Sequence, residues 1–119
     1  MKYSIFVKNF IDQIQMIVYN TTFHIEKDSI NECLAYLKKQ YIPKAAASGF
    51  LQKPCLRRII QTEQEEGESF SVQFHVKNMD TLNFWLQNEG NLLQKDLVNR
   101  FGYKIAGFST LLEELDWKI

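Results

Sequence analysis

The chain has 119 residues, of which 45% are hydrophobic and 24% are charged, and these values are typical of one folded domain. Lysine and arginine together number 14, as do aspartate and glutamate, so the formal net charge is zero. Proteins that bind nucleic acid or anionic membranes through their overall charge carry a basic excess, which this chain lacks. The composition therefore argues against both partners and leaves only a local basic patch as an exception.

Cysteine usage and the N-terminal segment indicate a cytoplasmic protein with no membrane anchor. We expect Cys33 and Cys55 to be reduced, partly buried thiols. No CxxC pair is present, and two isolated cysteines cannot complete a zinc site alone, so no metal is expected. Lys8 and Asp12 interrupt any leader-like apolar run, and no stretch approaches the ~18 apolar residues of a membrane span.

Residues 1–15 are predicted to form an N-terminal extension, because apolar residues recur there at the spacing of a short amphipathic helix. Two roles stay open for it: an extension that lies on the domain or frays, or a docking helix for a membrane or a partner. Residues 16–119 are predicted to form a single domain.

The first half of that domain is predicted to be a strand followed by a helix. The strand covers 16–25, where β-branched and aromatic residues occur without glycine or proline. Asp28 or Ser29 can cap the helix, and Ser29 with Glu32 has the spacing of a capping box. Pro43 then interrupts the helix and suits the start of a second short helical turn.

The second half begins with a predicted hairpin. A strand over 50–62 contains Pro54, which lacks an amide donor and so favours an edge position. A charged turn leads into the third strand, 69–76, in which large apolar and polar residues alternate. The longer helical pattern that follows bends or splits at Gly90, and a final strand is predicted over 103–115.

The order of these elements, β-α-β-β-α-β, is that of the ferredoxin-like α+β fold. Right-handed crossovers place the first and third strands at the centre of a four-stranded antiparallel sheet of order 4-1-3-2, with two helices on one face. Because alternate side chains of a strand point to opposite faces, the sequence also predicts which residues the helices cover. The predicted helix-facing set is Ile17, Tyr19, Phe23, Ile25, Phe70, Val72, Phe74 and Val76.

The other sheet face is predicted to be polar and to hold any functional site. It meets water, binds a ligand, or packs on the same face of a second chain to close a dimeric α+β barrel. If the hairpin turn is symmetric, Arg57 joins this face opposite Gln73, whereas a one-residue bulge would select Arg58 instead. The candidate ligand-binding residues are Asn20, Thr22, His24, Arg57, Ser71, Gln73 and His75.

The two histidines fall on this predicted polar face but at opposite ends of it. Their strands run antiparallel, so His24 and His75 are expected roughly 13 to 20 Å apart at ~3.3 Å per residue. Zinc ligands lie ~2 Å from the ion, so this topology excludes a shared metal within one chain. A strand histidine is more often a hydrogen-bonded or surface residue than a catalyst, although histidine is the side chain best suited to act as a base near neutral pH.

Known catalytic and RNA-binding patterns are absent from the sequence. There is no GxGxxG, GxxxxGKS/T, HExxH or GxSxG motif. Ferredoxin-like sheets that bind RNA present aromatic rings on the open face. Here Tyr19, Phe70 and Phe74 are predicted to face the helices, which disfavours nucleic acid as a partner.

Five segments resemble a family of small bacterial proteins known only as domain of unknown function 4286. The segments are MIVYNTTFHIEKDS, YIPKAAASGF, SVQFHV, NRFG and GFSTLLEEL. The resemblance spans residues 16–115 and implies a ferredoxin-like α+β fold. The family has no established activity, so the resemblance implies no catalytic residue. Tyr41 stands where we would expect a histidine in the family's pattern.

Three functions compete at this point, and the third is a partner-docking protein that uses the N-terminal segment 1–15. The first is a homodimeric, non-catalytic ligand-binding or regulatory module that uses the polar sheet face and needs no cofactor. The second is a cofactor-independent enzyme similar to the dimeric α+β barrel monooxygenases and isomerases, with His24 or His75 as general base. Asn20, Gln73 and Arg57 would then orient an anionic or enolic substrate. Only fold-level analogy supports the enzyme, so the sequence favours the non-catalytic module.

Overall fold

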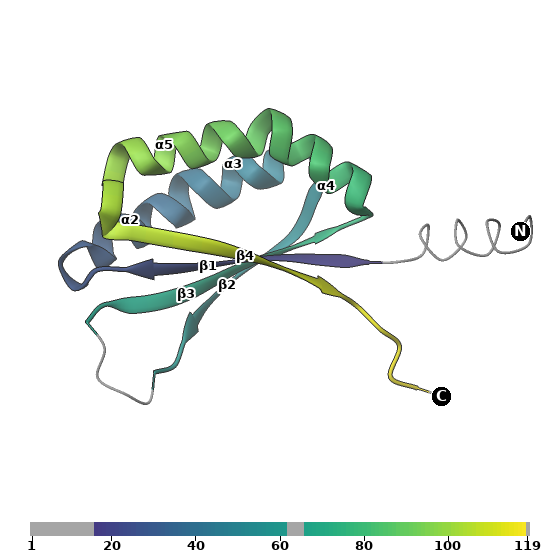
Figure 1. The fold of residues 1–119 in the computed structure, drawn as a ribbon, viewed down its shortest axis with the longest axis horizontal. Helices are drawn as coiled ribbons and strands as arrows, with labels where there is room; N and C mark the ends of the chain where they lie inside the picture. The colour runs from purple at the N-terminus through teal and green to yellow at the C-terminus, as the bar shows by residue number, and fades with distance from the viewer. Residues whose placement is uncertain (1–15, 62–65, 119) are drawn as a thin grey trace, which may run out of the picture.

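A four-stranded sheet carries a layer of helices on one face (Figure 1). The computed structural model describes residues 16–61 and 66–118, so the predicted extension 1–15 lies outside the described residues. In chain order the elements are β1 (Ile17–Ile25), α2 (Ile30–Tyr36), α3 (Ile42–Ala47), β2 (Leu51–Ile59), β3 (Glu68–Val76), α4 (Met79–Trp85), α5 (Asn91–Phe101) and β4 (Ile105–Glu113). Within the part of the chain that the structure describes, no helix is long and apolar enough to cross a membrane.

The sheet has the predicted topology. Its strands are antiparallel in the order β2-β3-β1-β4, which is the order 4-1-3-2 taken from the other edge. The central strands pair along their whole lengths, with Tyr19 opposite Phe74 and Phe23 opposite Phe70. Pro54 lies in the edge strand β2, as its missing N–H predicted. The ferredoxin-like α+β fold is therefore confirmed.

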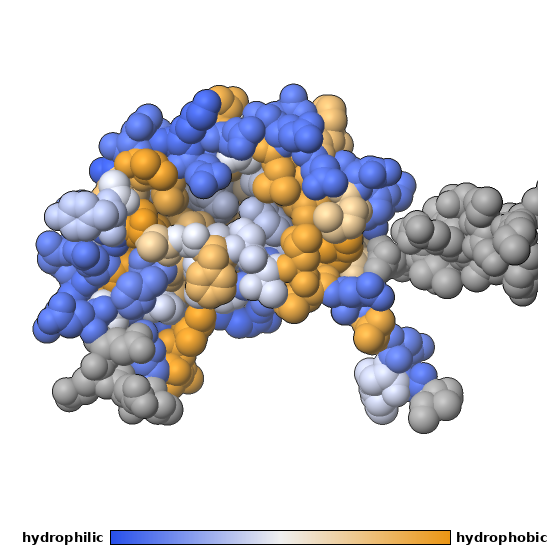
Figure 2. All heavy atoms as spheres, viewed as in Figure 1, coloured by the Kyte–Doolittle hydropathy of each residue, from blue (hydrophilic) through white to orange (hydrophobic). Residues whose placement is uncertain are grey.

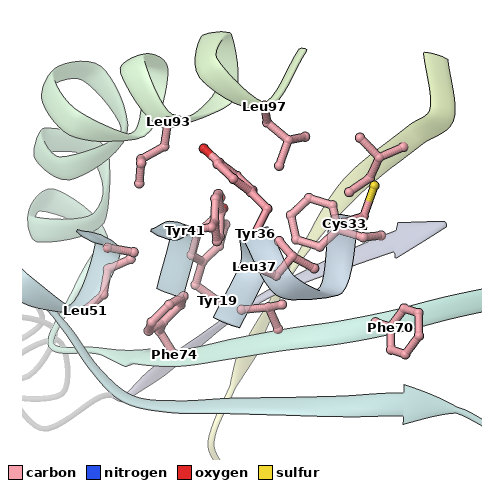
Figure 3. Packing of buried hydrophobic residues seen from close by; sticks show 14 of the residues in the cluster. Tyr19, Cys33, Tyr36, Leu37, Tyr41, Leu51, Phe70, Phe74, Leu93 and Leu97 are labelled. Atoms are coloured by element: carbon pink, nitrogen blue, oxygen red, sulfur yellow. The ribbon is translucent and has the colours of Figure 1, made fainter. Parts of the chain in front are cut away.

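The hydrophobic core lies between the helices and one face of the sheet. Every residue of the predicted helix-facing set is buried, and Phe74 is only 1% exposed. Figure 3 shows Tyr19 and Phe74 from the sheet below Leu93 and Leu97 of helix α5. Burial of one large apolar side chain stabilises the fold by roughly 1.5–3 kcal/mol, so the strands cannot turn over without losing most of the core.

Both helical segments contain a π-helical turn where the sequence predicted an interruption. The first, Leu37–Tyr41, comes just before Pro43, which has no N–H for an α-helical hydrogen bond. The second, Leu86–Gly90, ends at the predicted bend. A Cβ at Gly90 would lie 2.9 Å from ring carbon Cζ3 of Trp85, so the helix can pass over the indole only with glycine there.

The predicted capping box at the first helix is wrong. A 3-10 turn over Lys27–Ser29 precedes α2, and its backbone already bonds the N–H of Ser29 to the carbonyl of Glu26. The Ser29 hydroxyl donates to Asp28 instead of capping the helix. A side-chain cap occurs at α4, where Oδ1 of Asn78 accepts from the backbone N–H of Thr81 at 2.8 Å.

Candidate functional site

The candidate site is the sheet face that the helices do not cover. All the described helices lie on the opposite side of the sheet (Figure 1). On the open face, Asn20 pairs with Gln73 and Thr22 with Ser71 across the central strands. We call the polar strip the set that these strands and β2 place here, namely Asn20, Thr22, Arg57, Ser71, Gln73 and His75.

Asn20 is the centre of a hydrogen-bonded cluster in the polar strip. The Ser71 hydroxyl donates to Oδ1 of Asn20, and Nδ2 of Asn20 donates to Oγ1 of Thr22 at 3.1 Å. Asn20 is only 9% exposed, and a polar side chain tolerates such burial when its groups are bonded. The structure therefore brings three of the predicted site residues together as a preformed cluster.

Arg57 lies on the open face, as a symmetric hairpin predicted. Its Cα pairs with Ser71 instead of Gln73, a shift of two residues that keeps the same face. The strand irregularity lies between Gln52 and Cys55, away from the hairpin turn, so it does not turn Arg57 over. Nη1 of Arg57 reaches diagonally and donates to Oε1 of Gln73 at 3.1 Å. Within residues 16–61 and 66–118, the other guanidinium N–H groups of Arg57 make no hydrogen bond.

The neighbouring Arg58 points to the other side of the sheet. Its guanidinium lies 5.4 Å from the ring centroid of Phe70, which faces the helices, and Nε lies 3.7 Å from a carboxylate oxygen of Glu68. Arg58 therefore has two partners of its own and is excluded from the polar strip.

His24 is held by the hairpin. Its Nε2 lies 3.0 Å from the backbone carbonyl of Glu66, and its Nδ1 lies 2.9 Å from the Ser69 hydroxyl. A carbonyl only accepts, so Nε2 carries a proton, and in the neutral ring Nδ1 then accepts from the Ser69 hydroxyl. Both ring nitrogens are thus engaged, so His24 lies on the open face two residues from Thr22 but bonds to the hairpin and not to the Asn20 cluster.

His75 is at the opposite end of the strip. It pairs with Val18, whereas His24 pairs with Ser69, so the two histidines are six residue steps apart on β3, roughly 20 Å at ~3.3 Å per residue. Within residues 16–61 and 66–118, His75 makes no hydrogen bond, and no three metal-ligating side chains gather. The predicted separation of the histidines is confirmed.

Exposed apolar side chains flank the polar strip, and the sequence analysis missed them. Phe108 and Leu112 of β4 pair with Thr22 and Val18, so they share the open face, and they are 64% and 44% exposed. Ile59, opposite Ser69, is exposed at the other edge of the sheet. We call Ile59, Phe108 and Leu112 the apolar rim. Phe108 and Leu112 occupy even-numbered positions of β4 that point to one face. The sequence could have assigned them to the open face only with the pairing of β4 and β1 already known.

A cluster of interacting polar and charged side chains lies in the helix layer, away from the polar strip. The Tyr36 hydroxyl donates to Asp96, and Nε of Arg100 donates to the same carboxylate at 3.1 Å. Burial, followed by the bond to Asp96, raises the pKa of Tyr36 to about 12. The bond from Tyr36 and the contacts with Arg100 lower the pKa of Asp96. The cluster ties α2 to α5.

The split β-α-β-β-α-β order, the antiparallel sheet and the single covered face define a ferredoxin-like α+β domain. The chain belongs to the family described as domain of unknown function (DUF4286), whose model matches residues 16–115. No curated protein sequence matches the chain.

Solved structures share the fold at low sequence identity. An ethyl tert-butyl ether D (EthD) family protein from Bacillus halodurans is 13% identical with a TM-score of 0.64, covering 83% of this chain and 99% of that one. A dimeric ferredoxin-like protein from an uncultured marine organism is 12% identical with a TM-score of 0.56, covering 86% and 96%. A Bacillus cereus protein provisionally assigned as an antibiotic biosynthesis monooxygenase is 11% identical with a TM-score of 0.55, covering 87% and 97%.

Proposed function

We propose that the protein is a homodimeric, non-catalytic module that binds a small molecule on the polar strip. The observation that carries the proposal is the apolar rim, because Phe108 and Leu112 are 64% and 44% exposed on a face that no described element covers. Exposed large apolar side chains beside polar residues are typical of an interaction surface. A structurally similar marine protein is described as dimeric, which supports a second copy as the occupant.

Two such faces packed together would lie about 10 Å apart, the usual spacing of stacked sheets. The apolar rims would meet each other, and the polar strips would line the space between them. Arg57 lies on the face that would line that space, and a guanidinium is best matched by a carboxylate or enolate oxygen. We therefore propose a small anionic or enolic ligand, held by a few polar groups in a partly apolar pocket.

The oligomeric state tests the dimer. We expect the full chain to sediment as a dimer at micromolar concentration, and Phe108→Glu to convert it to a monomer, because the new carboxylate would be buried between two sheets. Tyr103→Glu is the matched control, since Tyr103 is exposed in the turn before β4 and outside the rim. A monomeric wild-type chain at that concentration would overturn the dimer.

Thermal shift in the presence of small carboxylates tests the ligand. A carboxylate that raises the melting temperature of the wild-type chain should lose that effect in Arg57→Ala, while Arg58→Ala should keep it because Arg58 faces the other side. Equal responses of the two variants would remove Arg57 from the site.

A second candidate function is a cofactor-independent enzyme with His75 as general base. The observation that favours it is the position of His75, which lies two residues from Gln73 on the strip and has no partner among the described residues. His24 is unsuited because both of its nitrogens are engaged. With a substrate in hand, His75→Gln should abolish turnover and keep binding, and retained turnover would eliminate this candidate.

A further inference from the structure

The two edges of the sheet differ in how they resist pairing with a further strand. At the β2 edge, Pro54 has no N–H to offer, and the pairing of β2 with β3 is interrupted between Gln52 and Cys55. Lys53, within that interruption, has a positive φ of 51°. Proline and bulges are among the usual means by which an edge strand avoids other strands. The β2 edge is therefore protected.

The opposite edge, formed by β4, lacks this protection. From Ile105 to Leu112 the strand contains no proline and no charged side chain. Its register with β1 runs without a shift from Ile105 to Glu113. A long, regular and uncharged edge of this kind is a template for another strand.

The hydrogen bonds to β1 identify the backbone groups of β4 that point away from the sheet. The N–H of Glu26 donates to the carbonyl of Lys104 at 2.9 Å, and the N–H of Glu114 donates to the carbonyl of Met16 at 3.0 Å. Each bond joins residues directly opposite in the β1–β4 register, and such pairs alternate along an antiparallel ladder. Even-numbered residues of β4 therefore bond to β1. The residues whose N–H and C=O point outward are Ile105, Gly107, Ser109, Leu111 and Glu113.

Exposed apolar side chains flank this edge on both sides of the sheet. Phe108 and Leu112 lie on the open side, and Leu111 lies on the helix side, opposite Tyr19, and is 48% exposed. In Figure 2, where β4 is in front as in Figure 1, pale and orange atoms occupy the middle of this side, below the blue surface of the helices. A strand added at the β4 edge would therefore cover apolar side chains on both of its faces.

The sequence of β4 is complementary to itself in one antiparallel register. When two copies of β4 pair about Thr110, Phe108 of each chain stands opposite Leu112 of the other. These two residues then form a non-hydrogen-bonded pair, the type in which opposing side chains lie closest. Ser109 stands opposite Leu111, and because the N–H and C=O groups of both point outward, the two residues exchange both hydrogen bonds.

The charges at the ends of the paired stretch agree with this register. Lys104 of one copy would stand opposite Asp116 of the other and diagonal to Glu114, so opposite charges meet. Glu113 would stand opposite Gly107, so like charges do not face each other. A second copy of this chain thus supplies both the apolar and the charged partners that the β4 edge can use.

We propose that the β4 edges of two copies pair antiparallel about Thr110, so that one sheet continues across both chains. This contact uses backbone groups at the sheet edge, so it is separate from the packing of two open faces and does not depend on a ligand in the polar strip. Backbone hydrogen bonds made at a surface replace bonds to water and contribute little net free energy. Edge pairing is therefore the weaker contact, and it joins face-to-face dimers at higher concentration.

Amide hydrogen exchange of the ¹⁵N-labelled full chain, at micromolar and at near-millimolar concentration, tests the pairing. We expect the amides of Ser109 and Leu111 to exchange at least about tenfold more slowly at the higher concentration. A nuclear Overhauser contact between the α protons of Phe108 and Leu112 should appear in the same sample. Residues four apart on one strand are separated by about 13 Å, so this contact arises only between two chains.

Leu111→Pro and Leu111→Ala form a matched pair of variants. Both shorten an exposed side chain, but proline also removes an N–H that points outward and is not used in the ladder with β1. We expect the slowing at Ser109 to be lost in Leu111→Pro and kept in Leu111→Ala, with the far-ultraviolet circular dichroism of both variants unchanged.

Equal exchange rates of the wild-type chain at the two concentrations, or absence of the contact between the α protons, would each overturn the proposal. Slowing at Ser109 in Leu111→Pro as large as in the wild-type chain would do the same. A chain that sediments as a dimer while Ser109 and Leu111 exchange equally fast at both concentrations would keep the face-to-face dimer and lose only the edge contact.

Discussion

The two faces of the central strands use the same backbone for different purposes. On the helix side, Phe70 and Phe74 of β3 are buried among apolar side chains. On the open side, Ser71 and Gln73 of the same strand bond to Asn20 and Arg57. Free energy of folding is therefore concentrated on one face, and the other face can change its side chains with little effect on the fold. This separation allows a binding surface to vary while the architecture persists.

Neighbouring residues of β3 give the largest expected contrast. Phe74→Ala should lower the free energy of unfolding by about 3–5 kcal/mol, because it removes a buried ring and leaves a cavity. Gln73→Ala, one position away on the open face, should lower it by less than about 1 kcal/mol. Urea unfolding of both variants measures the difference, and similar losses would contradict the division of the sheet into two faces.

Disrupting the hydrogen-bonded cluster around Asn20 should have a smaller effect on stability. It compares a bonded with an unbonded position on the open face. Asn20→Ala leaves Ser71 and Thr22 without their partner, so we expect a loss of about 1–2 kcal/mol in unfolding free energy. Thr110→Ala, at the exposed position opposite Asn20 on β4, should stay within about 0.5 kcal/mol of the wild-type chain. If Thr110→Ala costs as much as Asn20→Ala, the cluster is not what stabilises this face.

Alkaline pH should lower the stability of the folded state through groups on the helix side of the sheet, and this is the smallest of the expected effects. Burial raises the pKa of Cys33 from 9.0 to about 11, and burial with the bond to Asp96 raises that of Tyr36 from 10.0 to about 12. The folded state favours the protonated forms, so their contribution is complete below pH 9 and is lost as the pH rises through these values. Thermal midpoints between pH 8 and pH 11 should fall less in Tyr36→Phe than in the wild-type chain. An identical decline in both proteins would exclude Tyr36 as a source.

The sequence predicted the features that depend on alternation and element order. The buried positions of Phe70 and Phe74 follow from a period of two, and the strand order follows from the split connection. The sequence predicts Arg57 rather than Arg58 on the open face only if the hairpin turn is symmetric. Alternation along β2 does not determine how β2 is aligned with β3. The apolar rim was missed because the face of Phe108 depends on how β4 pairs with β1. The placement of α5 on the sheet depends on contacts between distant segments, which no local pattern encodes.

The π-helical turn before α5 has a consequence for insertions and deletions in this family. Such a turn holds one residue more than an α-helical turn, and each residue of an α-helix advances the direction of its side chain by about 100°. Loss of one residue between 86 and 90 would restore regular winding and rotate all that follows, so that Leu93 and Leu97 would swing out of the interior. Homologues are therefore expected to keep the length of this segment constant even where its amino acids differ.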